Sequence, residues 1–110
     1  MNISDLEKKL GYTCLQAQFA DGPLTGGYTS DLLSDVMAHA PEKSVLITIQ
    51  AHKNTVAVAT LADVKAILLC NSRTPEEEML AAAGKEGVAI FQTDENQFQA
   101  SCRIGAALSE

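Results

Sequence analysis

The sequence predicts a three-layer α/β/α fold, in which a small, mainly parallel sheet lies between two layers of helices. Three observations lead to this prediction. The runs Ser44–Ile49 and Val64–Leu69 are almost entirely apolar, which is typical of strands covered on both faces. Candidate strands and helices alternate along the chain with short connections, which favours parallel strands. The length of 110 residues is that of one domain.

A short amphipathic helix is predicted at the start of the chain, because apolar residues recur there at helical spacing and Gly11 can end it. Either Asn2 or Ser4 can provide the N-cap. The stretch Thr13–Phe19 then alternates polar and apolar residues, which indicates a half-buried strand. The apolar residues of the predicted N-terminal helix are Ile3, Leu6 and Leu10.

Turns are predicted at Asp21-Gly22-Pro23 and at Gly26-Gly27, since these residue types favour turn conformations. Ser30 can then cap a helix that extends to about His39, with Asp31 and Asp35 facing water. An apolar stripe of this helix is expected to face the core. The stripe consists of Leu32, Leu33, Val36, Met37 and Ala40.

The segment Lys53–Ala62, between the two buried runs, is ambiguous. Val56 and Val58 alternate as they would in a strand, and propensity alone favours that interpretation. The alanines and Leu61 instead suit a helix capped by Asn54.

The strongest local signal predicts a helix after the second buried run. Thr74 can cap it, Pro75 suits its first position and Glu77 can complete a capping box, while Gly87 is well placed to end it. Its inward residues are expected to be Met79, Leu80 and Ala83.

A strand and a helix complete the chain. Val88–Phe91 is predicted as a short strand, and Asp94 with Gln97 three residues later opens the last helix. That helix is expected to bury residues drawn from Phe98, Cys102, Ile104, Ala106 and Leu108.

Composition excludes several functions. Eight Lys+Arg against fourteen Asp+Glu give a net charge of −6, which argues against binding of nucleic acid or of an anionic membrane. No basic start precedes an apolar run, and no apolar stretch approaches the roughly 20 residues of a membrane span. We therefore expect a cytoplasmic protein, with a core of alanine and aliphatic residues because aromatic residues make up only 5%.

The three cysteines predict no redox or metal centre. Cys14, Cys70 and Cys102 are far apart, no C-x-x-C pair occurs, and each lies among apolar residues. We expect three reduced thiols in the core.

No motif of a known catalytic or nucleotide-binding centre occurs. The chain lacks the P-loop, the G-x-G-x-x-G fingerprint, the G-x-S-x-G elbow and the H-E-x-x-H metal motif. His39 is expected near a helix C-terminus, where a histidine interacts favourably with the helix dipole, and not as a ligand. The sequence therefore predicts no catalytic residue, no metal ligand and no cofactor.

Polar side chains follow the predicted parallel strands where each strand ends, and ligands of open α/β sheets bind at that edge. Taken singly, each of these residues fits a cap or a turn, and only their convergence indicates a ligand pocket. The candidate residues are His52, Asn54, Asn71, Ser72, Arg73 and Thr93.

A second candidate is Gly26-Gly27 before the predicted helix, since a flexible backbone leading into a helix N-terminus can bind an anion. Asp31 and Asp35 would repel phosphate, and a glycine turn with a serine cap is the favoured interpretation.

Four segments closely resemble short, stand-alone DRTGG-domain proteins of anaerobic bacteria. They are Thr25–Val36, Ile47–Gln50, Ala57–Ala59 and Ile67–Pro75, and the resemblance extends over about residues 12–108. The family's Asp-Arg falls where this chain has Gln50-Ala51-His52-Lys53, and its Thr-Gly-Gly falls at Cys70-Asn71-Ser72.

The resemblance implies a single DRTGG-like domain over residues 1–110, with residues 1–11 as a helical extension. It implies a fold similar to the N-terminal domain of HPr kinase/phosphorylase, with Thr55–Ala62 helical. Because the kinase P-loop is absent here, kinase activity is not implied.

Family context implies a non-catalytic regulatory or interaction domain, dimeric, which modulates a metabolic enzyme. The alternative is a sensor of a nucleotide or organic anion at the strand ends. An enzyme in its own right is the least favoured interpretation.

Overall fold

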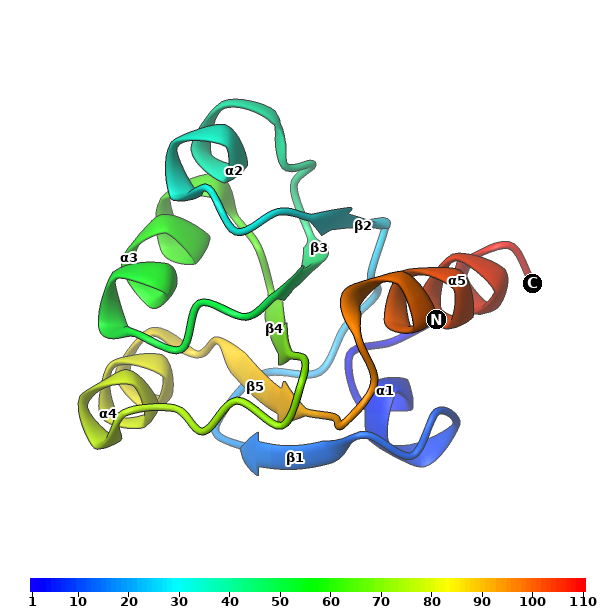
Figure 1. Ribbon diagram of the computed structural model, residues 1–110, viewed down its shortest axis with the longest axis horizontal. Helices are drawn as coiled ribbons and strands as arrows, with labels where there is room; N and C mark the ends of the chain where they lie inside the picture. The colour runs from blue at the N-terminus through cyan, green and yellow to red at the C-terminus, as the bar shows by residue number, and fades with distance from the viewer.

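Five strands form one sheet in the order β1-β5-β4-β3-β2, and helices cover both of its faces (Figure 1). The computed structural model describes residues 1–110. The strands are β1 (Thr13–Gln16), β2 (Gly26–Thr29), β3 (Ser44–Thr48), β4 (Ala66–Leu69) and β5 (Ala89–Gln92). The helices are α1 (Asp5–Lys8), α2 (Leu33–His39), α3 (Lys53–Ala62), α4 (Glu77–Glu86) and α5 (Gln97–Leu108). Strands β2 to β5 are parallel and β1 is antiparallel to β5, so the predicted fold class is confirmed.

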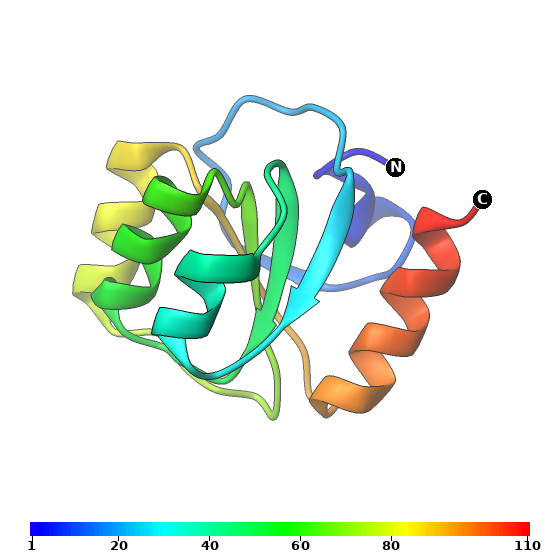
Figure 2. The same cartoon turned by 90° about the horizontal axis from the view of Figure 1, so that it is seen from above.

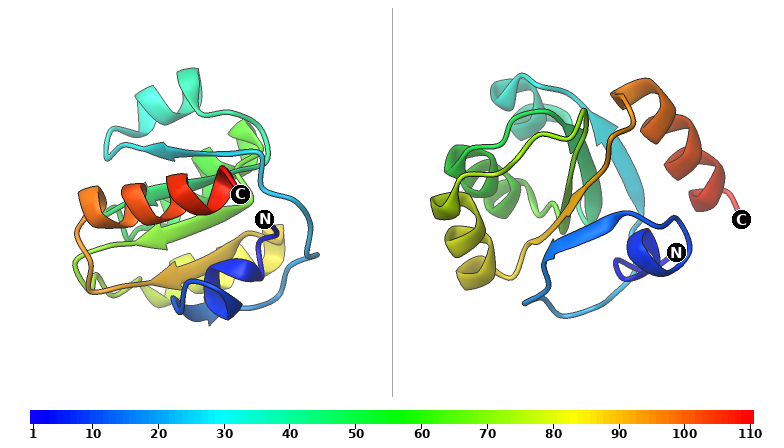
Figure 3. Two further views of the ribbon diagram at one scale, coloured as in Figure 1. Left: turned by 90° about the vertical axis from the view of Figure 1, so that its right-hand side faces the viewer. Right: turned by 60° about the horizontal axis from the view of Figure 1, so that its bottom comes forward.

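The two helical layers bury separate apolar clusters against the sheet. Helices α2, α3 and α4 cover one face, and α5 with α1 lies on the other (Figures 2 and 3). Side chains of β3 alternate between the clusters, with Val45 and Ile47 towards α5 and Leu46 towards α2–α4. This alternation explains why the strand sequence is apolar throughout. No helix has the length and hydropathy needed to cross a membrane.

The glycines Gly26 and Gly27 form an edge strand, so the predicted turn there is wrong. They belong to β2, which pairs in parallel with β3 from Gly26 opposite Ser44 onwards. Glycine weakens a strand locally, and pairing with the buried β3 holds the backbone extended here.

Helix α2 begins two residues later than predicted. Ser30 does not cap it, because its hydroxyl accepts the N–H of Leu32 instead, and no side chain caps this helix. Of the expected apolar stripe only Val36 is fully buried, while Leu32 and Met37 are exposed.

Helix α3 resolves the ambiguous segment. Thr55, Val56 and Ala59 are buried at helical spacing, and Asp63 ends the helix in the left-handed region with φ of 58°. The helix implied by the family resemblance is therefore confirmed over the strand favoured by propensity. Its N-cap position is His52, not Asn54, and no side chain caps it.

The two C-terminal helices each begin two residues later than predicted. Glu76 takes the N-cap position of α4 without a side-chain cap, so Thr74 and Pro75 precede this helix. Gly87 ends it with φ of 71°, as expected. Helix α5 has a capping box made by Asn96 and Gln99.

Two burial predictions fail, both on helix α5. Cys70 is buried and Cys14 half-buried, but Cys102 is exposed, so only part of the predicted thiol core exists. Phe98 is also exposed, and α5 buries Ala100 and Ile104 instead.

Candidate functional site

The loops that follow β4 and β5 lie side by side at the edge where the parallel strands end. The backbone N–H of Asn71 donates to the carbonyl of Glu95 at 2.9 Å, and that of Ser72 donates to the carbonyl of Thr93 at 2.8 Å. The carbonyl of Arg73 accepts from the amide of Gln92 at 2.9 Å. Four of the predicted site residues thus belong to two loops held together by hydrogen bonds.

The backbone of the first of these loops is unusual. Asn71 and Ser72 both have positive φ, 58° and 53°, in the left-handed region that favours glycine. The family resemblance places a Gly-Gly pair at these positions. The loop therefore has the conformation that glycines would adopt freely, and the side chain of Ser72 pays a steric cost for it.

His52 and Asn54 have different surroundings, at the start of α3. Nδ1 of His52 lies 3.4 Å from the carboxylate of Glu76, and both side chains are well exposed. Asn54 lines a groove between α3 and α4. Gly26 and Gly27 are elsewhere again, since they pair with the first residues of β3 and so lie towards the opposite end of the sheet.

Asp31 is the residue that sequence reasoning misplaced. Instead of facing water, its carboxylate Oδ1 accepts from the Thr48 hydroxyl at 2.9 Å, the Ile49 N–H at 2.9 Å and the Gln97 amide at 3.0 Å. The amide of Gln50 donates to its carbonyl at 3.0 Å. Asp31 therefore joins the ends of β2 and β3 to the start of α5, and it closes this part of the strand-end edge.

A second polar cluster fastens the middle of α5. The guanidinium of Arg103 donates to Glu95 at 2.7 Å and to the Leu10 carbonyl at 2.7 Å, and it lies 5.1 Å from the centre of the Tyr12 ring. The hydroxyl of Tyr12 donates to the other oxygen of Glu95 at 2.8 Å. Burial raises the pKa of Tyr12, and its bond to Glu95 adds to that rise. Every group in this cluster has a partner within the chain, which indicates a structural role.

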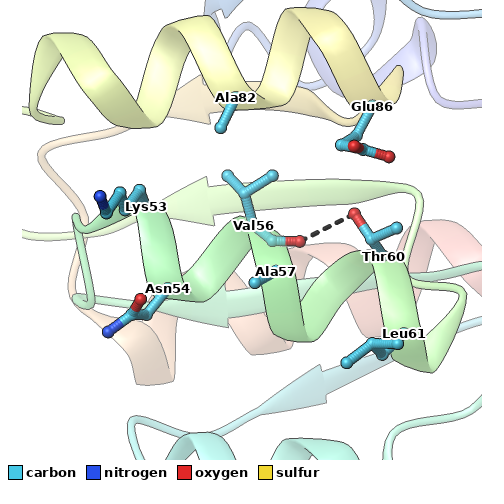
Figure 4. Close-up of a pocket in the computed structure, with 8 residues that line it drawn as sticks. All are labelled: Lys53, Asn54, Val56, Ala57, Thr60, Leu61, Ala82 and Glu86. Atoms are coloured by element: carbon cyan, nitrogen blue, oxygen red, sulfur yellow. Dashed lines mark hydrogen bonds between the residues drawn. The ribbon is translucent and has the colours of Figure 1, made fainter.

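The open hollow on the helical layer is apolar. A groove of about 380 Å³ runs between α3 and α4 (Figure 4). The Thr60 hydroxyl donates back to the Val56 carbonyl at 2.9 Å, and Leu61 is 74% exposed at the edge of the groove. The lining residues are Lys53, Asn54, Val56, Ala57, Thr60, Leu61, Ala82 and Glu86. Of the predicted site residues, only Asn54 lines any of the four hollows of the molecule.

No family model matches this sequence, and no curated protein is similar to it. Among solved structures, the chain is similar to the CBS and DRTGG domains of the regulatory region of Clostridium perfringens pyrophosphatase, complexed with the activator diadenosine tetraphosphate. The TM-score is 0.68 at 14% identity, over 91% of this chain and 44% of that one. This chain thus spans less than half the length of its neighbour, and the likeness supports a DRTGG-like fold.

Proposed function

We propose that this protein is a non-catalytic regulatory domain, a homodimer, which modulates a metabolic enzyme by binding it at the groove between α3 and α4. One observation carries the proposal. The edge where open α/β sheets bind small ligands is closed around Asp31 by its own hydrogen bonds, whereas the α3–α4 groove is open and apolar. The likeness to the regulatory region of a pyrophosphatase supports a regulatory role.

The charges beside the groove define the partner's chemistry. Glu86 lines one end and has no cation partner within the chain, and Glu78 borders Lys53 at 3.3 Å on the exposed surface. With a net charge of −6, the whole molecule favours a basic partner. The proposed binding segment therefore has an apolar side chain, which enters the groove, flanked by Lys or Arg.

Two exposed alanines allow a matched test of this surface. Ala57 lines the groove on α3, whereas Ala81 is exposed on α4 outside it. We expect Ala57→Asp to abolish cross-linking of the domain to its partner enzyme and the change in that enzyme's rate when purified domain is added. Ala81→Asp should leave both intact. Equal behaviour of the two variants, or an enzyme rate that the wild-type domain does not change, would contradict the proposal.

A second candidate function is a sensor of a nucleotide or organic anion at the strand ends. Its support is the pairing of the Asn71–Arg73 loop with Thr93, together with the nucleotide activator bound in the similar structure. The exposed Arg73 would supply the charge that recognises phosphate or carboxylate. His52 and Asn54, at the start of α3, lie outside this hydrogen-bonded pair of loops.

Thermal unfolding with ATP, AMP and diadenosine tetraphosphate tests the sensor. A ligand at 100 times its Kd adds about 2.7 kcal/mol to the free energy of unfolding. We expect a shift that Arg73→Ala removes. No shift with any of the three, at millimolar concentration, would contradict nucleotide sensing without affecting the groove.

A further inference from the structure

The outer edge of β2 pairs with no strand. β2 is the last strand of the sheet, and Figure 2 looks on to its free edge, with α2 on one side and α5 on the other. Its residues, Gly26-Gly27-Tyr28-Thr29, include no charge and no proline. Edge strands expose unpaired N–H and C=O groups, and proteins usually protect them with charges, prolines or bulges. The other edge strand, β1, has such an irregularity between Cys14 and Gln16, whereas β2 pairs with regular register.

Three glycines border this edge without a need for glycine within the chain. Gly26 and Gly27 are extended, and a Cβ there would make ordinary contacts at 3.5 Å with Pro41 and 3.6 Å with Val45. Gly105 lies inside α5, and a Cβ there would meet nothing within 4 Å. Glycine destabilises strand and helix interiors relative to alanine. The fold of one chain requires glycine at none of these positions, and at Gly105 the space that a side chain would occupy is open to atoms from outside the chain.

The outward face of α5 is uncharged, which is unusual for an exposed helix of an acidic protein. Its one charged residue, Arg103, is held by Glu95 and by the Leu10 carbonyl. Phe98 is 77% exposed on this helix. Depletion of charge together with an exposed aromatic residue is typical of the centre of an interface.

The uncharged face lies next to the free edge. The hydroxyls of Ser101 and Thr29 are 2.7 Å apart, and a Cβ at Gly27 would lie 3.8 Å from Ile104, so α5 runs antiparallel to β2. Phe98 shares the face of Ser101, because residues three and four apart lie together on a helix. Cys102 and Gly105 continue this face. We call β2 together with Phe98, Cys102 and Gly105 the β2 edge surface.

We propose that the β2 edge surface is a two-fold interface with a second copy of this chain. β2 pairs antiparallel with the β2 of the partner copy, and Phe98 of each copy packs over Gly105 of the other. The inference rests on the dimer of the proposed function and assigns its surface.

A second copy fits because the surface is complementary to itself. It holds both a projecting ring, at Phe98, and a site without a side chain, at Gly105, two turns apart on one face. A two-fold axis between two copies places Phe98 of each copy over Gly105 of the other. Thr29 lies against Ser101 and Gly27 against Ile104, so the middle of β2 lies near residue 103 of α5. This point is within about half a helical turn of the midpoint between Phe98 and Gly105. One two-fold axis can therefore relate both the two strands and the two Phe98–Gly105 contacts. On the α5 side, two chains of charge −6 can also meet without bringing like charges together, because α5 contains no acidic residue.

The size of the surface predicts the strength of association. Helix α5 is about 18 Å long, and β2 extends about 13 Å. Such a patch lies at the low end of specific interfaces, below about 1,200 Å² in total. We therefore expect a dimer that dissociates in the micromolar range.

Sedimentation equilibrium from 1 to 500 μM measures the dimer Kd and tests the proposal with two variants, one that adds bulk to the surface and one that adds a charge. Gly105→Leu adds a side chain whose Cβ meets nothing within 4 Å in its own chain, and it would occupy the space proposed for the partner's Phe98. Phe98→Asp adds a charge at the same contact. Both are expected to raise the dimer Kd at least tenfold. Ala81→Leu, which adds comparable bulk to an exposed position of α4, should leave it unchanged.

Cys102 gives an independent readout, because it lies near the proposed axis. With diamide as oxidant, two Cys102 thiols lose two protons and two electrons to the reagent and form one intermolecular disulfide. We expect a covalent dimer from the wild type, but none from Cys102→Ser or from Gly105→Leu.

The outcomes separate this inference from the proposed function. A wild type that stays monomeric at 500 μM overturns both the dimer and this surface. A dimer that persists in both variants and forms no Cys102 cross-link overturns only the surface. A monomer in which Phe98→Asp abolishes capture of the enzyme, while Ala57→Asp does not, assigns the edge to a strand of that enzyme and overturns the second copy as its occupant.

Discussion

Replacing Asp31 tests whether this carboxylate holds the strand ends together. In Asp31→Ala three donors lose their acceptor: the Thr48 hydroxyl, the Ile49 N–H and the Gln97 amide. A hydrogen bond to a charged group contributes about 1.5–3 kcal/mol when well buried. Asp31 is half-buried, so we take about 1 kcal/mol for each bond and expect a loss of about 3 kcal/mol. Asp31→Asn keeps an acceptor oxygen but loses the charge, and should lose about 1 kcal/mol.

Urea unfolding measures the loss, and exchange of the Ile49 amide hydrogen locates it. For a domain of this size, 3 kcal/mol corresponds to a fall in Tm of about 12 °C. Asp35→Ala is the control, because this neighbouring carboxylate accepts one hydrogen bond, from the Tyr28 hydroxyl, at the surface. It should lose less than Asp31→Ala and leave Ile49 exchange unchanged. If Asp31→Ala lost under about 0.5 kcal/mol, or left Ile49 as protected as before, Asp31 would not be closing the strand ends.

Three further predictions concern the thiols and the strained loop. Under native conditions at protein concentrations too low for dimerisation, a thiol reagent should modify exposed Cys102 first, and buried Cys70 only as the chain unfolds; equal rates would contradict the burial of Cys70. Burial raises the pKa of Cys70 from 9.0 to about 11. The unfolded chain therefore loses this proton first, and the thiol's contribution to stability, complete below pH 9, should disappear as pH rises to 11. Urea midpoints should record that fall, and it should be smaller in Cys70→Ser. Ser72→Gly should raise the free energy of unfolding by about 0.5–1 kcal/mol by relieving the positive φ, whereas Ser72→Ala should not.

The sequence predicts the central strands well, because burial on both faces makes the residues of each strand apolar throughout. β3 and β4 need no information beyond their own residues, since strands between two helical layers are apolar throughout. The residues of β2 contain no such apolar run. Two of its four residues are glycine, and the strand exists because β3 offers hydrogen bonds along a buried edge. Sequence patterns therefore mistake it for a turn.

Helix starts illustrate a different limit. The segment before α5 contains two overlapping capping-box patterns, Asp94 with Gln97 and Asn96 with Gln99, and only the second forms. The side chain of Gln97 instead donates through its amide to Asp31, which is far away in sequence. A contact across the fold thus decides between two local signals of equal strength.

The candidate site likewise combines one feature that the sequence predicts with one that it does not. That Asn71, Ser72 and Thr93 lie together follows from parallel strands ending at one edge, and the backbone hydrogen bonds between the loops agree. That the β2–β3 part of this edge is closed depends on Asp31, whose local sequence is that of an ordinary first-turn helix residue. Its orientation is decided where β2 and β3 end side by side, and no pattern within one segment records this.

The two proposed surfaces lie far enough apart in the fold to act together. The β2 edge surface is at one end of the strand order, whereas α4, which borders the groove, packs against β1 and β5 at the other end. Pairing through β2 would therefore leave both grooves of a dimer open. Two grooves on one rigid particle can bind two sites of an oligomeric enzyme, and the second contact then forms at high effective concentration. If both proposed surfaces are used, a dimer would therefore bind such an enzyme more tightly than one copy of the domain could.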